Sequence, residues 1–159
     1  MHRDPLRVRE RRPKILALSS GGGHWVQLLR LRPAFEDCDV TYATVRSTYR
    51  SDIDRGHFVV IPDCNRNQKV RVLWSAFRVL LLLVRLRPNV LVTTGAAPGY
   101  VAVRLGRTLG VRTVWVDSVA NAEELSMSGR MAGLHAGLWL TQWPHLAKSV
   151  GPHFRGSVL

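Results

Sequence analysis

The residues best suited to bind a charged substrate form one short run near the start of the chain. It consists of Ser20, Gly21, Gly22, Gly23 and His24. The run follows an apolar stretch at 15–18 and precedes residues 25–31, whose apolar side chains repeat at helical spacing. A glycine turn between a strand and a helix exposes backbone N–H groups, which bind anions, most often phosphate or diphosphate. Two interpretations stay open: an anion site, or a tight turn that binds no ligand.

His24 is the candidate catalytic residue of this turn. It falls in the first turn of the predicted helix, where an imidazole can donate a hydrogen bond or take up a proton. The turn does not have the dinucleotide-binding spacing, because the third glycine of that pattern would fall on Trp25 or Val26.

A second group of candidates lies between residues 94 and 128. Asp117 follows a predicted strand, and a carboxylate there can act as a general base or bind sugar hydroxyls. With Glu123 and Glu124 it forms the densest acidic cluster, three of the 11 carboxylates, although solvated loop acids are the alternative. Ser126 is expected to cap a helix. The residues predicted at this substrate edge besides Asp117 are Gly95, Ala96, Ala97, Pro98, Gly99, Ser118, Ser126 and Ser128.

The spacing of the histidines and cysteines predicts no metal site. The six His and two Cys form no metal motif, and the sequence contains neither a Walker loop nor a recognisable Ser/His/Asp order. Cys38 and Cys64 are expected to be two reduced, buried thiols.

The elements that must position these residues alternate between apolar, β-branched runs and helix-like segments. This alternation predicts an α/β fold with a doubly wound parallel sheet. Ligands of such sheets bind at the C-terminal ends of the strands, so the glycine run and residues 94–99 should share one edge. The predicted strands are residues 14–19, 39–44, 58–61, 90–94, 113–116 and 138–141, and the predicted helices are residues 24–31, 69–86, 99–109, 128–134 and 144–150.

Length and charge limit the classes of protein. A chain of 159 residues suffices for one domain, and no stretch reaches the roughly 18 apolar residues of a membrane-spanning helix. The net charge of +12 comes from 20 Arg and 3 Lys against 11 acidic residues, which favours nucleic acid or an anionic membrane as partner. Scattered arginines and the lack of a recognition motif disfavour nucleic acid. Residues 1–13 are predicted to be a flexible basic arm, and residues 14–159 a single lobe.

Residues 69–86 have the pattern of a helix with a wide apolar surface and a narrow basic ribbon. Two interpretations stay open: a crossover helix buried against the sheet with its arginines in solvent, or an interfacial helix on a membrane. Both can hold for different parts of one helix. The residues predicted to meet the membrane are Arg71, Trp74, Phe77, Arg78, Leu81 and Arg85.

Several motifs, taken in order along the chain, resemble one known family. They are Ser20-Gly21-Gly22-Gly23-His24, Thr94-Gly95-Ala96-Ala97-Pro98-Gly99, Asp117-Ser118, Leu125-Ser126-Met127-Ser128-Gly129-Arg130 and Thr141-Gln142-Trp143-Pro144. Over about residues 14 to 157, this order is similar to the Asparagine-Linked Glycosylation Fourteen-like family and its bacterial capsule and exopolysaccharide relatives. The family usually has Glu where Asp117 stands and Arg where Asn121 stands.

The resemblance implies a Rossmann-like fold that forms one lobe of a two-lobed GT-B glycosyltransferase. It implies that this chain binds the acceptor and is inactive alone, while a separate small subunit binds the UDP-sugar, so this chain holds no cofactor. The sugar would be N-acetylglucosamine or a related hexose or uronic acid, transferred in polysaccharide or oligosaccharide biosynthesis. The acceptor would be a polyprenyl-diphosphate-linked glycan, its diphosphate on the glycine turn, with the chain peripheral on the cytoplasmic face of the cell membrane. The predicted contacts with the partner subunit are Gln142, Trp143 and Pro144.

Two other functions are the alternatives: a basic nucleic-acid-binding protein, and a small enzyme that acts alone on a sugar nucleotide. The charge distribution disfavours the first. The second would be expected to need two lobes, whereas residues 14–159 are predicted to form one.

Overall fold

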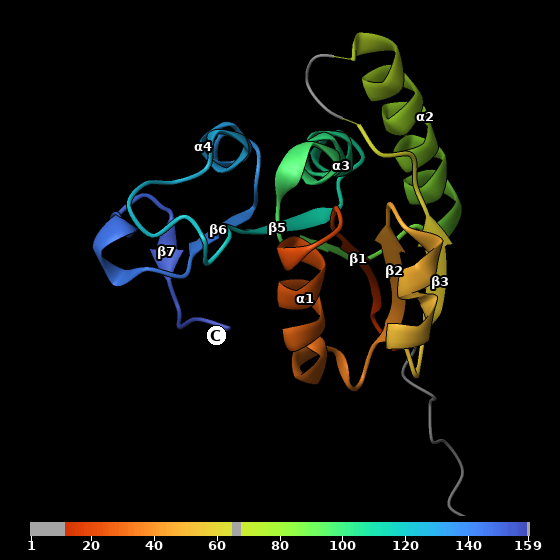
Figure 1. Ribbon diagram of the computed structural model, residues 1–159, viewed down its shortest axis with the longest axis horizontal. Helices are drawn as coiled ribbons and strands as arrows, with labels where there is room; N and C mark the ends of the chain where they lie inside the picture. The colour runs from red at the N-terminus through yellow and green to blue at the C-terminus, as the bar shows by residue number, and fades with distance from the viewer. Residues whose placement is uncertain (1–11, 65–67, 159) are drawn as a thin grey trace, which may run out of the picture.

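The computed structural model describes residues 12–64 and 68–158, which form one seven-stranded sheet covered by helices on both faces (Figure 1). The strands are β1 (Lys14–Leu18), β2 (Asp39–Thr44), β3 (His57–Val60), β4 (Val90–Thr93), β5 (Arg112–Val116), β6 (Leu138–Thr141) and β7 (His153–Phe154). All neighbouring pairs are parallel, in the order β3-β2-β1-β4-β5-β6-β7. The predicted doubly wound parallel sheet is therefore confirmed.

Four α-helices and three short 3₁₀ helices connect these strands in the described part of the chain. In Figure 1, α2, α3 and α4 lie on one face of the sheet and α1 lies on the other. The helices are α1 (Gly23–Arg30), η1 (Arg32–Phe35), η2 (Ser47–Asp52), α2 (Lys69–Leu86), α3 (Ala96–Thr108), α4 (Met127–Gly133) and η3 (Pro144–Leu146). This arrangement buries both sides of the central strands, as their apolar, β-branched sequences require.

The core has one layer on each face of the sheet. On the α1 side, Trp25 and Leu28 pack against Tyr42 of β2 and Val92 of β4. On the other side, Leu16, Leu18, Leu91 and Trp115 of the strands pack against Val79 and Leu83 of α2 and Ala102 and Val103 of α3. These packed layers fix the positions at which the strands end, and so the positions of the loops described below.

The structure differs from the predicted elements in three places. Residues 144–150 do not form a helix: η3 ends at Leu146, and Ala147 is already extended. The segment bends because Trp143 and His145 donate ring N–H groups to backbone oxygens of residues 119 and 122, and Gly151 and Pro152 follow. The short strand β7 was not predicted, because two residues carry no periodic pattern. Helix α3 begins at Ala96, three residues before its predicted start.

The predicted arm, residues 1–13, falls mostly outside the described part of the chain. Residues 1–11 are not described, and of the rest Pro13 accepts a hydrogen bond from the backbone N–H of Asp39. Within the described residues, no helix combines the length and apolar character that a membrane crossing needs.

Candidate functional site

The candidate site lies where the order of the strands reverses. The chain builds outward from β1 through β2 to β3, then returns to pair β4 with the other side of β1. In open parallel sheets, ligands bind at the C-terminal ends of the strands on either side of such a reversal. The loops after β1 and β4 are those that contain residues 20–24 and 94–97, so the prediction that they share one edge is confirmed.

The glycine turn has the geometry of an anion site. Gly22 is the N-cap of α1 with a φ of 66°, a left-handed conformation that favours glycine. Gly22 and Gly23 are exposed, and the first N–H groups of a helix have no acceptor inside the helix. The positive end of the helix dipole therefore lies at an exposed turn, where a Cβ on Gly22 or Gly23 would meet no neighbouring atom.

A reciprocal pair of hydrogen bonds joins this turn to the loop after β4. His24 Nδ1 lies 2.7 Å from the carbonyl oxygen of Thr94, and Thr94 Oγ1 donates to the carbonyl oxygen of His24 at 2.7 Å. A carbonyl oxygen only accepts, so Nδ1 carries the proton. The neutral ring then has its lone pair on Nε2, where it can accept a proton or a hydrogen bond.

Gly95 makes this contact possible. Its φ is 123°, and a Cβ at this position would lie 3.0 Å from two atoms of the His24 ring. Gly95 is also the N-cap of α3, so a second helix N-terminus begins beside His24. Pro98 and Gly99 are buried, and Gly99 packs against the Thr93 side chain, which gives these two predicted edge residues a packing role.

Two residues next to the glycine turn, Arg46 and Tyr49, were not predicted from the sequence. Tyr49 Oη accepts a hydrogen bond from Gly22 N at 3.0 Å, and its ring stacks on Trp25 with centroids 5.3 Å apart. Arg46 Nε would lie 3.6 Å from a Cβ built on Gly21. Both residues follow β2, the neighbour of β1. Only the parallel β1–β2 pairing could have revealed them, because 27 positions separate Gly22 and Tyr49.

Asp117 lies in the next loop of this edge, and its carboxylate is fully occupied. It is 2% exposed and accepts hydrogen bonds from Trp115 Nε1, Asn121 Nδ2, and both the backbone N–H and the hydroxyl of Ser126. Ser126 caps α4 by accepting from Gly129 N at 2.8 Å, as predicted. This geometry favours a structural role for Asp117, and a role in proton transfer stays a prediction. Ser128 is half-buried in α4.

A buried glutamine pair connects α1 to that loop and to the end of β6. Gln27 donates to Ser118 Oγ and accepts from Val119 N and from Gln142 Nε2. Gln142 also donates to Asp117 O and accepts from Val158 N. Ser118 is buried, and these bonds occupy its hydroxyl inside the protein.

The predicted partner contact at residues 142–144 is only partly accessible. Gln142 is 3% exposed, so the structure contradicts its assignment to a docking surface. Its polar atoms are instead satisfied inside the protein, as described above. Trp143 is half-buried and donates to Val119 O at 2.8 Å, whereas Pro144 is exposed. The sequence pattern could not distinguish a buried polar anchor from a surface residue.

Helix α2 has both a buried and an exposed apolar face. Ser75, Val79 and Leu83 are buried against the rest of the protein. The opposite side exposes large apolar side chains by 49–80%, and the stacked rings of Trp74 and Phe77 lie 5.8 Å apart. Leu81 is half-buried. Arg71, Arg78 and Arg85, seven residues apart, follow one line along the helix and are exposed. The exposed apolar residues of α2 are Val70, Leu73, Trp74, Phe77 and Val84.

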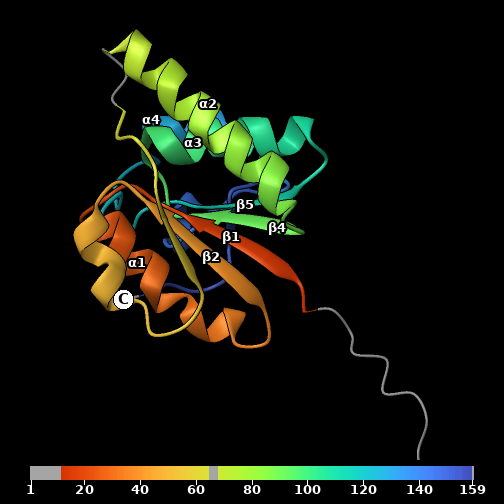
Figure 2. The same cartoon turned by 90° about the vertical axis from the view of Figure 1, so that its right-hand side faces the viewer.

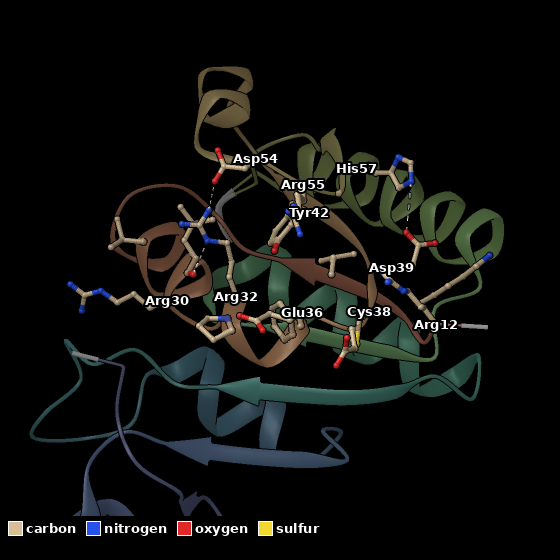
Figure 3. Close-up of a pocket in the computed structure, with 18 residues that line it drawn as sticks. Arg12, Arg30, Arg32, Glu36, Cys38, Asp39, Tyr42, Asp54, Arg55 and His57 are labelled. Carbon is tan, nitrogen blue, oxygen red and sulfur yellow. Dashed lines mark hydrogen bonds and ion pairs between the residues drawn. The ribbon is translucent and has the colours of Figure 1, made fainter. Parts of the chain in front are cut away.

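A separate open cavity of about 1500 Å³ lies on the α1 face, near the end of α1 (Figure 3). It contains none of the site residues predicted from the sequence. Burial raises the pKa of Tyr42, and the Arg32 charge offsets part of the increase. Arg32 is held by Asp54 at 3.6 Å. Basic and acidic side chains alternate around this cavity, which gives it no clear preference for a charged ligand.

The cysteines and potential metal ligands show no reactive cluster. Cys38 and Cys64 are free, and burial raises the pKa of the Cys64 thiol. Among residues 12–64 and 68–158, no three His, Cys, Asp or Glu side chains gather as a metal site.

Comparisons with known proteins agree with this architecture. Residues 66–156 match the family model described as "Oligosaccharide biosynthesis protein Alg14 like". No curated protein matches the chain in sequence.

Solved structures share the fold at low sequence identity. MurG of Acinetobacter baumannii has a TM-score of 0.73 at 12% identity, over 91% of this chain and 45% of that one. UDP-N-acetylglucosamine 2-epimerase of Rickettsia bellii has a TM-score of 0.70 at 10% identity, over 92% and 45%. CalG4, the calicheamicin glycosyltransferase, has a TM-score of 0.51 at 14% identity, over 68% and 32%. The chain thus spans less than half the length of these structures, and the likeness concerns the fold alone.

Proposed function

Because this chain belongs to the Alg14-like family of oligosaccharide biosynthesis proteins, we propose that it is the acceptor-binding subunit of a two-subunit glycosyltransferase. The family and the GT-B-type fold give it a glycosyltransferase-related role in glycan biosynthesis. In the proposal, a small partner subunit holds the UDP-sugar, and this chain holds a polyprenyl-diphosphate-linked glycan. The sugar transferred is N-acetylglucosamine or a related hexose or uronic acid.

The observation that carries the proposal is the joining of two helix N-termini by His24 and Thr94. The starts of α1 and α3 meet through hydrogen bonds of 2.7 Å at the reversal of the strand order. Each start has backbone N–H groups and the positive end of a helix dipole. Two adjacent anion sites suit the two phosphates of a diphosphate better than one isolated charge.

In this proposal His24 is the general base for the acceptor hydroxyl. Thr94 O holds the Nδ1 proton, so Nε2 is free to take the hydroxyl proton. The hydroxyl oxygen forms its bond to the sugar carbon while the bond from that carbon to UDP breaks. The UDP leaves with its electron pair, and the partner subunit stabilises its charge.

The proposal also places the chain on the cytoplasmic face of the cell membrane. The exposed apolar band of α2, centred on Trp74 and Phe77, would enter the lipid, and the line of arginines would meet anionic head groups. Arg78 lies 6.0 Å from the Trp74 ring, so the charge and the aromatic surface are adjacent. A lipid-linked acceptor could then reach the site without leaving the membrane.

The test is co-expression with a small protein that has the fold of a glycosyltransferase donor lobe, sought first in the neighbouring reading frames. Sugar transfer to a polyprenyl-diphosphate-linked acceptor should require both proteins. Each purified protein alone serves as the control. Turnover of a sugar nucleotide by this chain alone, or no transfer by the pair, would contradict the proposed function.

A further inference from the structure

The loop after β2 lies beside the glycine turn, on the side opposite the loop after β4. Strand β1 lies between β2 and β4, so the loops after these two strands flank the turn from opposite sides. The β4 side contributes backbone groups and His24's partner, Thr94. The β2 side contributes a charged side chain, Arg46, beside Gly21.

The loop that carries Arg46 is held in place by side-chain contacts, and the described residues give the Arg46 guanidinium itself no protein partner. Tyr49 accepts from Gly22 N and stacks on Trp25, and Trp25 Nε1 donates to Asp52 at 2.8 Å. These contacts clamp η2 onto the first turn of α1 and hold the loop that carries Arg46. Within the described part of the chain, Arg46 itself has no recorded hydrogen bond or ion pair, and it is exposed. Arg46 thus lies next to the glycine turn with its N–H donors unused by the described residues. A guanidinium in this position is suited to bind an anionic ligand of the turn.

We propose that Arg46 binds the acceptor diphosphate at the glycine turn and that Tyr49 positions the turn for this contact. The proposal rests on the acceptor-binding function proposed above and names one further residue of that site. A diphosphate carries more negative charge than a monophosphate and extends over two phosphates. The two helix starts hold the phosphates through backbone N–H groups, and Arg46 adds a forked set of charged donors from the β2 side of the turn. Arg46 therefore gives the site a preference for diphosphates.

The experiment measures binding of geranyl diphosphate and geranyl monophosphate to the full chain by calorimetry, without lipid. Arg46→Ala should weaken diphosphate binding about tenfold, the scale of one lost charge-assisted hydrogen bond, and monophosphate binding less. Arg46→Lys should retain an intermediate affinity. Tyr49→Phe keeps the stacked ring but removes the acceptor of Gly22 N–H, and should weaken both ligands. Arg112→Ala, the same charge change at the opposite edge of the sheet, should leave both affinities unchanged.

The outcomes separate this inference from the proposed function. If the unmodified chain binds the diphosphate and Arg46→Ala binds it equally well, the role of Arg46 is wrong and the acceptor function stands. If the unmodified chain binds neither ligand, the acceptor function fails and the inference with it. A separate flotation assay uses anionic vesicles that lack the diphosphate. If Arg46→Ala weakens flotation but leaves binding of geranyl diphosphate unchanged, Arg46 meets lipid head groups and the inference is overturned. Circular dichroism and thermal unfolding verify that each variant is folded.

Discussion

At the scale of single residues, the proposed function gives His24 two separable roles. Its Nδ1–H holds Thr94 O and thereby joins two loops, while Nε2 is free for chemistry. The ring is partly exposed and packs on Gly95, so its orientation is fixed before a substrate arrives. Two substitutions can test whether Nδ1 holds the loop while Nε2 takes part in the reaction.

His24→Ala should reduce sugar transfer about 100-fold or more, because both the base and the contact with Thr94 are lost. His24→Asn retains a donor near the Nδ1 position and should fold with near-normal stability, yet it should transfer sugar as poorly as the alanine variant. The measurement is kcat/KM of the co-expressed pair, with thermal unfolding of each variant as the control. Normal transfer by His24→Asn would leave His24 a positioning role only.

At the scale of elements, the loop after β5 is held by one carboxylate. Asp117 accepts four hydrogen bonds that join β5, the loop and the start of α4. Gly129 lies so close that a Cβ there would be 2.5 Å from Asp117 Oδ1. The loop is thus a fixed part of the edge of the sheet that carries the candidate site.

Asp117→Asn should lower the free energy of unfolding by about 1–3 kcal/mol, because the amide NH₂ would face groups that are themselves donors. Urea unfolding measures the loss. Glu124→Gln is the matched control: Glu124 pairs with Arg130 at 3.1 Å but its side chain is 81% exposed, so its loss should cost less than about 1 kcal/mol. Unchanged stability of Asp117→Asn together with abolished transfer would instead indicate a direct role in catalysis.

For helix α2, the sequence left open whether the helix is buried or lies on a membrane. Vesicle binding can test the role of its exposed apolar residues. Replacing Arg71, Arg78 and Arg85 by Glu should weaken flotation with anionic liposomes and remove most of its salt dependence, because each arginine contributes about 1 kcal/mol near such a surface. Trp74→Ala with Phe77→Ala should weaken the binding that persists at high salt. A charge-matched triple Glu variant at Arg55, Arg104 and Arg112 is the control. Recovery of the unmodified protein in the soluble fraction at low salt, even with its partner, would contradict membrane docking.

At the scale of the whole molecule, the start of α2 and the candidate site lie toward the same end of the sheet. Helices α1 and α2 both follow the C-terminal ends of parallel strands, and Figure 2 shows their starts at the same end of the sheet. The start of α2 extends beyond the rest of the protein there. A membrane that touches this end of α2 would therefore lie on the side of the molecule where the acceptor diphosphate is proposed to bind.

This placement predicts a dependence on the length of the acceptor lipid. The Trp74→Ala, Phe77→Ala variant should lose transfer to a long-chain polyprenyl acceptor in vesicles but keep transfer to a short-chain, water-soluble acceptor. The ratio of the two kcat/KM values is the measurement, because it cancels any general loss of activity. An equal loss on both acceptors would show that these residues support the fold or the site instead of membrane docking.

The sequence by itself determined the alternation of elements and the position of the glycine turn between a strand and a helix. Periodicity identifies a strand or a helix because burial on one face or both imposes a local repeat, and residues 20–24 carry their own signal in glycine and histidine. The sequence-based prediction failed where contacts with distant residues outweighed the local pattern. Residues 144–150 are drawn away from a helix by hydrogen bonds to residues 119 and 122.

Only the tertiary structure decided which candidates are buried and which lie beside the glycine turn. Gln142 and Asp117 read as surface or catalytic residues in the sequence, but folding buries them within one hydrogen-bond network. Arg46 carried no signal at all, and it reaches the glycine turn because β2 pairs with β1 in register. Burial and proximity arise from which strands become neighbours, and this depends on packing across the whole sheet, which no local pattern of residues encodes.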